Sequence, residues 1–187
     1  MKAKSRLMMA VFVIASLQNN FAADSDLSKL AAAHNTFAFK LLKQLAAEQP
    51  DTSVFVSPYS AATALQMAAN GSAGRTRTEM QTVLGTSNLS TIELNVAIKA
   101  AVDLFDAKDT NIIFTTANAL WYRQGTQIKP SFVEANQNYF SSTVRPLDFR
   151  NVPEAEAEIN QWASDQTHGR ITGIANGIID PLYTDLV

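Results

Sequence analysis

The sequence predicts an α+β fold in which helices come first and strands are mixed with helices later. Apolar residues recur at three- and four-residue steps through much of the first hundred positions, the spacing of a helical face. β-Branched and aromatic residues become denser after residue 110, which favours strands. No repeat or Gly/Ser-rich linker divides the 187 residues, so we predict one domain or part of a larger one.

Helices in the first part of the chain are expected where this apolar spacing meets start and stop signals. The expected helices cover 27–45, 58–70, 76–85 and 90–105. Ser57 can cap the second helix, because its hydroxyl can accept a bond from an unpaired amide and Pro58 fits a first turn. Capping boxes at 76–79 and 90–93 predict the next two starts, and Gly85 predicts a stop.

Strand-type runs lie at 54–56, 111–122 and 144–149, and further helices are expected over 130–140 and 153–169. Because helices separate these runs, we expect a sheet that lacks its neighbouring strands. A long strand with an open edge carries unpaired amides and carbonyls, so this sheet needs partners.

The first residues predict an export signal. Three cationic side chains within the first six residues precede an apolar run over 7–17, which is too short to span a bilayer as a helix. We expect a signal peptide over 1–22, a domain over 23–187, and a secreted protein, extracellular or, in a bacterium, periplasmic.

Composition excludes several classes of chemistry. The chain has no cysteine, so it has no disulfide, thiolate metal site or cysteine nucleophile. Its formal charge of −2, without a basic stripe, argues against a nucleic-acid partner. We expect no cofactor, no metal, no membrane partner and a monomer. Asn70 and Asn88 begin glycosylation sequons, which would be used only in a eukaryotic secretory pathway.

No catalytic constellation is evident. Ser57 and Ser60 would need a base to act as nucleophiles, and the chain offers only His34 and His168. Asp165 stands three residues before His168, but a third catalytic partner is missing. We predict that the protein is not an enzyme, and keep an exported hydrolase using either serine as the weakest hypothesis.

Five stretches, taken in order, resemble segments of the serpin family. They are 35–39 (Asn-Thr-Phe-Ala-Phe), 53–60 (Ser-Val-Phe-Val-Ser-Pro-Tyr-Ser), 71–80 (Gly-Ser-Ala-Gly-Arg-Thr-Arg-Thr-Glu-Met), 116–121 (Thr-Ala-Asn-Ala-Leu-Trp) and 159–171 (Ile-Asn-x-Trp through Thr-His-Gly-Arg-Ile). Their order and intervals across nearly all of 23–187 make the resemblance specific. It implies a serpin-like fold in which the N-terminal helices and part of the large sheet A form an incomplete domain.

The resemblance implies a serine protease inhibitor. In that family a target protease, serine or cysteine, cleaves an exposed reactive loop, which then inserts as a new strand into sheet A. Ser57, Ser60 and Asn160 match family positions that act as a shutter-like conformational switch, whereas Ser53 stands where the family usually has asparagine.

The end of the sequence resembles the run into the next strand of sheet A. We therefore expect a fragment that ends before the reactive loop and that inhibits no protease alone. The alternative function is a non-inhibitory serpin-like carrier or chaperone, which the reactive-loop sequence would distinguish from an inhibitor.

Overall fold

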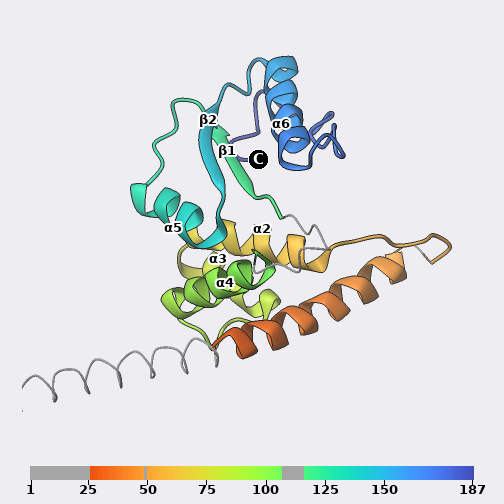
Figure 1. The fold of residues 1–187 in the computed structure, drawn as a ribbon, viewed down its shortest axis with the longest axis vertical. Helices are drawn as coiled ribbons and strands as arrows, with labels where there is room; N and C mark the ends of the chain where they lie inside the picture. The colour runs from red at the N-terminus through yellow and green to blue at the C-terminus, as the bar shows by residue number, and fades with distance from the viewer. Residues whose placement is uncertain (1–25, 49, 107–115) are drawn as a thin grey trace, which may run out of the picture. The chain divides into compact units, whose positions relative to one another are not determined.

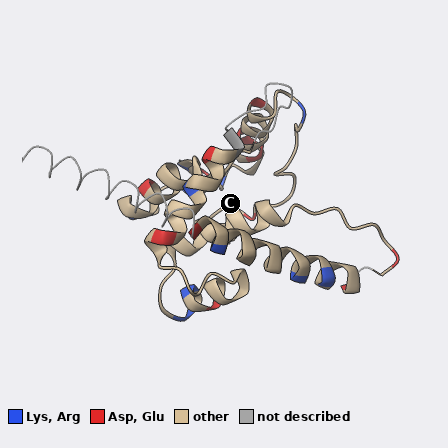
Figure 2. Cartoon of the chain, turned by 60° about the horizontal axis from the view of Figure 1, so that its bottom comes forward, with Lys and Arg blue, Asp and Glu red and all other residues tan. Residues whose placement is uncertain are grey.

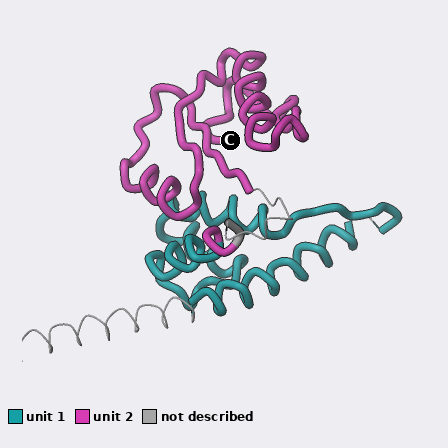
Figure 3. The backbone as a smooth tube through the Cα atoms, in the orientation of Figure 1, with its two compact units in different colours: residues 1–101 teal, residues 102–187 magenta. Residues whose placement is uncertain are grey.

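The computed structural model describes residues 26–48, 50–106 and 116–187, and the chain forms two compact units (Figure 3). Unit 1 ends at Ala101 and unit 2 begins at Val102, so the boundary falls within a helix. Each unit has a hydrophobic core of its own. The expected signal peptide lies outside the described residues, as does the start of the expected strand over 111–122.

Unit 1 is helical in its described part (Figure 1). Its helices are one over residues 26–48, α2 (Pro58–Gly71), α3 (Gly74–Leu84) and the start of α4 (Thr91–Asp106). The buried side chains of Phe37, Ala62 and Leu84 join the first three helices in one core cluster. The helices expected over 27–45, 58–70 and 90–105 are thus confirmed.

Local side-chain bonds begin two of these helices as expected. Ser57 caps α2, because its hydroxyl oxygen accepts a bond from the Ser60 amide at 3.2 Å. At α4, Glu93 accepts from the Ser90 amide at 2.8 Å while the Ser90 hydroxyl accepts from the Glu93 amide at 3.3 Å. Both donors that a capping box satisfies are therefore paired.

The expected capping box at 76–79 is wrong. α3 begins at Gly74 after Ala73, which makes no side-chain capping bond. Glu79 instead accepts a bond from Arg75 Nε at 2.6 Å, an ion pair of the i,i+4 type. Gly85 ends the helix as predicted, with a φ of +72° that disfavours residues with a Cβ.

The run over 54–56 does not form a strand. A strand needs a hydrogen-bonding partner, and none pairs with this run in the described part of the chain. Phe55 is fully exposed as a result.

Unit 2 contains a two-stranded parallel sheet. β1 (Ala119–Arg123) pairs with β2 (Thr143–Leu147), with Trp121 opposite Arg145, and α5 (Pro130–Phe140) lies between them in the sequence. Parallel strands need such a crossover, since a tight turn cannot join them. α6 (Val152–Gln166) follows β2, so helices and strands alternate here and the α+β expectation is confirmed. Within the described residues β1 starts later than expected, at Ala119.

The core of unit 2 joins the sheet, α6 and the irregular chain after it. Its buried members are Trp121, Leu147, Phe149, Ala155, Ile159, Ala175 and Ile179. Trp162 of α6 meets Trp121 edge to face, with ring centroids 5.0 Å apart at 86°. This packing holds α6 against β1. None of the helices in the described ranges is both long and apolar enough to cross a membrane.

Candidate functional site

The two serines expected to act as a switch touch each other at the start of α2. Their hydroxyl oxygens lie 2.9 Å apart, and either can donate the hydrogen. Both side chains are exposed in unit 1. Because Ser57 also accepts from a backbone amide, its hydroxyl serves a structural role before any other.

His34 does not serve either serine as a base. Its Nε2 lies 3.0 Å from Nε2 of Gln66, and its ring meets the Tyr59 ring edge to face at 6.1 Å. Burial lowers the pKa of His34, because desolvation disfavours the imidazolium. Burial also raises the pKa of Tyr59. In these described contacts neither serine has a base that would activate it as a nucleophile, as the hydrolase hypothesis requires.

Asn160, the third expected switch residue, lies on α6 in unit 2. Its side-chain oxygen accepts from the amides of Ile174 at 2.7 Å and Ala175 at 2.9 Å, and its nitrogen donates to Asn176 Oδ1 at 3.0 Å. One side chain thus ties the irregular chain after α6 back to the helix. Glu156, one turn earlier, adds a bond from the Gly177 amide at 2.6 Å.

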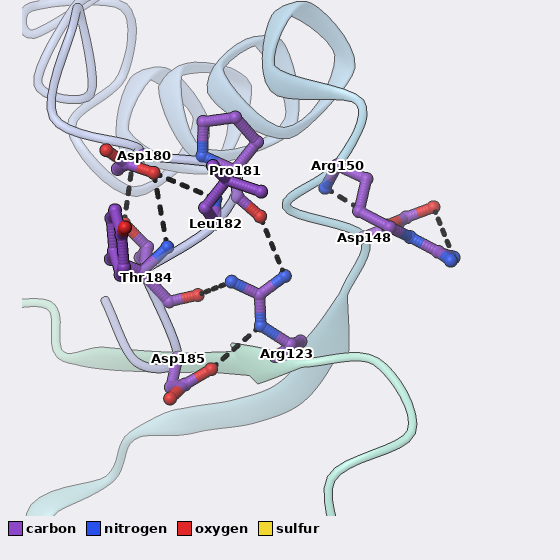
Figure 4. A network of polar contacts seen from close by, with 9 residues as sticks. Arg123, Asp148, Arg150, Asp180, Pro181, Leu182, Thr184 and Asp185 are labelled. Carbon is purple, nitrogen blue, oxygen red and sulfur yellow. Dashed lines mark hydrogen bonds and ion pairs between the residues drawn. The ribbon is translucent and has the colours of Figure 1, made fainter.

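Arg123, at the end of β1, holds the next part of the chain (Figure 4). Its Nε donates to Asp185 Oδ1 at 2.8 Å, and its two terminal nitrogens donate to the carbonyls of Pro181 and Thr184. The guanidinium also lies over the Phe149 ring, 5.9 Å from its centroid. We call this set of contacts the Arg123 clasp.

The turn that the clasp holds is itself ordered by side chains. Asp180 Oδ1 accepts from the amides of Leu182 at 2.8 Å and Tyr183 at 3.1 Å, and the Thr184 hydroxyl accepts from the Asp180 amide at 2.8 Å. An aspartate that binds amides two and three residues ahead is typical of a tight turn. The turn therefore presents its carbonyls to Arg123 in a fixed geometry.

Beyond this turn, residues 185–187 pair with the free edge of β1. Trp121 and Val187 exchange both backbone bonds at 2.9 Å, and the Arg123 amide donates to the Asp185 carbonyl at 2.9 Å. The pairing is antiparallel, with Leu186 opposite Tyr122. β1 is thus flanked by β2 on one edge and by a segment more than 60 residues away on the other (Figure 1). A sheet of this kind grows by addition of strands along its edge.

The Arg123 clasp was not among the sites predicted from the sequence. An arginine after an apolar strand is usually solvated, so its type alone gave no signal. The resemblance did indicate a run into a strand at the end of the sequence, and the Asp-Pro pair at 180–181 is a turn signal that could have located the turn before it.

Two glutamates at the start of α6 have protein partners. Glu154 accepts from Asn151 Nδ2 at 2.5 Å, and Glu158 pairs with Arg145 at 2.8 Å. Within the described residues, no three carboxylate or imidazole groups converge.

The Asp165 and His168 pair is not formed either. Asp165 accepts instead from Gln161 at 2.8 Å, and His168 has a left-handed φ of +52° after the end of α6.

Elsewhere in the described chain, Lys and Arg are spread over several elements among Asp and Glu (Figure 2). Mixed charges of this kind are typical of a solvated surface.

Comparisons with known proteins agree with the resemblance that the five sequence stretches indicated. The family model described as "Serpin (serine protease inhibitor)" matches residues 32–187, which is more than half of the chain. Human corticosteroid-binding globulin is 31% identical over 160 residues, covering 84% of this chain and 40% of its own. An uncharacterized serpin-like protein of Thermococcus kodakarensis is 33% identical over 145 residues, covering 77% of this chain and 34% of its own.

Solved structures give the same result for the fold. The crystal structure of protease nexin-1 with heparin has a TM-score of 0.76 at 25% identity, covering 86% of this chain and 43% of that one. Human thyroxine-binding globulin has a TM-score of 0.78 at 25% identity, with the same two coverages. The chain spans 34 to 40% of the length of these two curated relatives.

Proposed function

Because the chain belongs to the serpin family, we propose that the whole protein inhibits serine-type endopeptidases by inserting a cleaved loop into a β-sheet. In this mechanism the protease breaks one peptide bond of the loop and stays bound through an acyl ester to its own serine. Strand insertion then traps that intermediate before water can hydrolyse it. The role is not enzymatic.

The observation that supports this proposal is the sheet in unit 2. β1 already pairs with two segments that are distant in sequence, and the antiparallel one is positioned by side chains. Asn160 and Glu156 hold the intervening chain to α6. A sheet that adds a distant segment to a strand edge, with a covering helix tied to the incoming chain, is suited to accept a further strand.

We also propose that Ser57, Ser60 and Asn160 are switch residues. The hydroxyls of Ser57 and Ser60 share one hydrogen bond at 2.9 Å, and each hydroxyl hydrogen can rotate to a new acceptor at little cost. Secretion and a monomeric state stay predictions.

The chain of residues 1–187 by itself is expected to inhibit no protease. Its described sheet has two strands and a three-residue third, whereas insertion needs strands on both sides of the new one. The test is incubation with a panel of serine and cysteine proteases, followed by denaturing electrophoresis. An SDS-stable adduct formed by this chain alone would overturn the expectation.

The complete product of the same gene tests the inhibitory proposal. It should form an SDS-stable adduct with at least one serine protease, at the summed mass of the two proteins. Cleavage without an adduct across the panel would contradict the proposal and favour the second candidate, a carrier.

The names of the relatives are what favour a carrier, since corticosteroid- and thyroxine-binding globulins are among them. A depression in unit 1, lined by Leu65, Met80 and Val83, measures about 200 Å³. Ligand sites usually measure about 300 to 1,000 Å³, so this depression is small for such ligands. Fluorescence titration of the complete product with cortisol and thyroxine checks the carrier role.

A further inference from the structure

A small cavity with polar and apolar lining lies in unit 1, between α2, α3 and the connection to α4. It offers about 10 Å³ to the centre of a water-sized sphere. Gln66 and Asn70 line it from α2, Arg77 from α3, and Thr86 from the connection. Gln66 is 2% exposed and Thr86 is fully buried.

Each of these four residues places one polar atom out of contact with solvent. The atoms are Gln66 Oε1, Asn70 Nδ2, Arg77 Nε and Thr86 Oγ1, and none bonds to another described protein atom. Leaving a buried polar atom without a partner is costly, so buried polar atoms in native proteins nearly always have one. Four such atoms, all on residues that line one cavity, indicate a shared partner.

The orientations of the two amides are set by bonds at their other ends. Gln66 Nε2 lies 3.0 Å from Nε2 of His34, so its oxygen is the end left for the cavity. Asn70 Oδ1 accepts from Asn95 Nδ2 at 3.2 Å, so its nitrogen is the end left for the cavity. The cavity therefore presents two N–H donors, one carbonyl acceptor and one hydroxyl that can accept.

We propose that this cavity is a binding site for a single water molecule that joins α2, α3 and the connection to α4. Water accepts two hydrogen bonds and donates two, which matches Asn70 Nδ2 and Arg77 Nε as donors and Gln66 Oε1 and Thr86 Oγ1 as acceptors. The cavity volume is about that needed for one water.

Other occupants fit this set of atoms less well. An anion would face the carbonyl oxygen of Gln66, and a metal cation would face the N–H groups of Asn70 and Arg77. An apolar molecule would leave all four atoms without partners. Direct pairing does not satisfy the four atoms in the structure, since none of them bonds to another described protein atom.

A crystal structure of the chain, with and without a sodium bromide soak, tests the site. We expect one ordered water within about 2.7 to 3.2 Å of the four atoms, and no anomalous bromide peak there. A bromide peak, or direct bonds among the four side chains with no room for water, would overturn the proposal.

Two methionine variants on α3 provide a matched pair. In Arg77→Met the water loses one donor, so we expect the unfolding equilibrium constant to rise about 10-fold. In Arg75→Met it should change less than about 3-fold, because Arg75 is exposed and pairs only with Glu79 among described residues. Equal effects of the two variants would contradict a special role for Arg77.

Thr86→Val is the second variant, and it nearly conserves volume while removing the hydroxyl. We expect the water to stay with three partners and the unfolding equilibrium constant to rise about 5-fold. A water that keeps its position with unchanged stability would show that Thr86 is not one of its ligands.

Discussion

Replacing Arg123 by methionine should loosen the pairing of residues 185–187 with β1. Methionine keeps an apolar stem against Phe149 but removes all three donated bonds. Each bond from a charged donor to a carbonyl contributes about 1.5 to 3 kcal/mol when buried. The Arg123 side chain is 22% exposed and that of Asp185 is 78% exposed, so the ion pair adds less than about 1 kcal/mol.

After discounting for this exposure, we expect a loss of about 2 to 3 kcal/mol in the local stability of the segment. That loss corresponds to a roughly 30- to 150-fold larger open population, and so to amide exchange faster by the same factor, at 1.36 kcal/mol for each factor of ten. Native-state hydrogen exchange measures it directly, because the amides of Trp121, Arg123 and Val187 donate across this pairing.

Arg145→Met is the matched control. Arg145 lies on β2 opposite Trp121, and its ion pair with Glu158 is about 40% exposed at both side chains, so its loss should cost less than about 1 kcal/mol. The reasoning is refuted if the three amides keep their protection in Arg123→Met, or lose as much in Arg145→Met.

Three further predictions concern the switch residues and His34. Asn160→Ala should expose the Ile174 and Ala175 amides and speed their exchange about 10- to 30-fold, whereas Asn160→Asp keeps the acceptor and should restore most of the protection. Ser57→Ala should cost about 1 kcal/mol in urea unfolding through loss of the cap, while Ser57→Asn, another good capping residue, should cost much less. The pKa of His34 is lower in the folded state than in the unfolded state, so below about pH 6.5 the unfolded state binds a proton that the folded state does not. The free energy of unfolding therefore carries the full His34 contribution above about pH 6.5 and loses it as pH falls toward the folded pKa. Urea unfolding between pH 7.5 and 5 should therefore show a steeper decline for the wild type than for His34→Gln, by at most about 1.4 kcal/mol per pH unit. Parallel declines would show that His34 is not the group responsible.

Helix boundaries were predictable where the signal is local. Pro130 starts α5 and Gly85 ends α3 because their own backbone preferences act at those positions. The box at 90–93 formed for the same reason. The box at 76–79 failed because α3 begins earlier, at Gly74, so Thr76 lies inside the first turn, and Glu79 bonds Arg75 instead.

The contacts of the candidate site could not be predicted from the sequence. The resemblance indicated Asn160, yet its partners lie 14 to 16 residues away in chain without regular structure. The partners of Arg123 lie 58 to 62 residues away. Contacts of this separation depend on tertiary packing, which periodicity and capping rules do not encode. The run at 54–56 shows the same limit, since strand propensity cannot supply a partner.

The two backbone hydrogen bonds between Trp121 and Val187 fix the register of the strand pairing beyond the three residues 185–187. They make this a hydrogen-bonded antiparallel pair, so any polypeptide that continues past Val187 would run toward Ala119, and its first residue would face Leu120. Side chains alternate along a strand, so that first residue would point to the same face of the sheet as Leu120 and the next to the face of Ala119. A one-residue insertion just before Asp185 would therefore exchange the two faces of every position that follows.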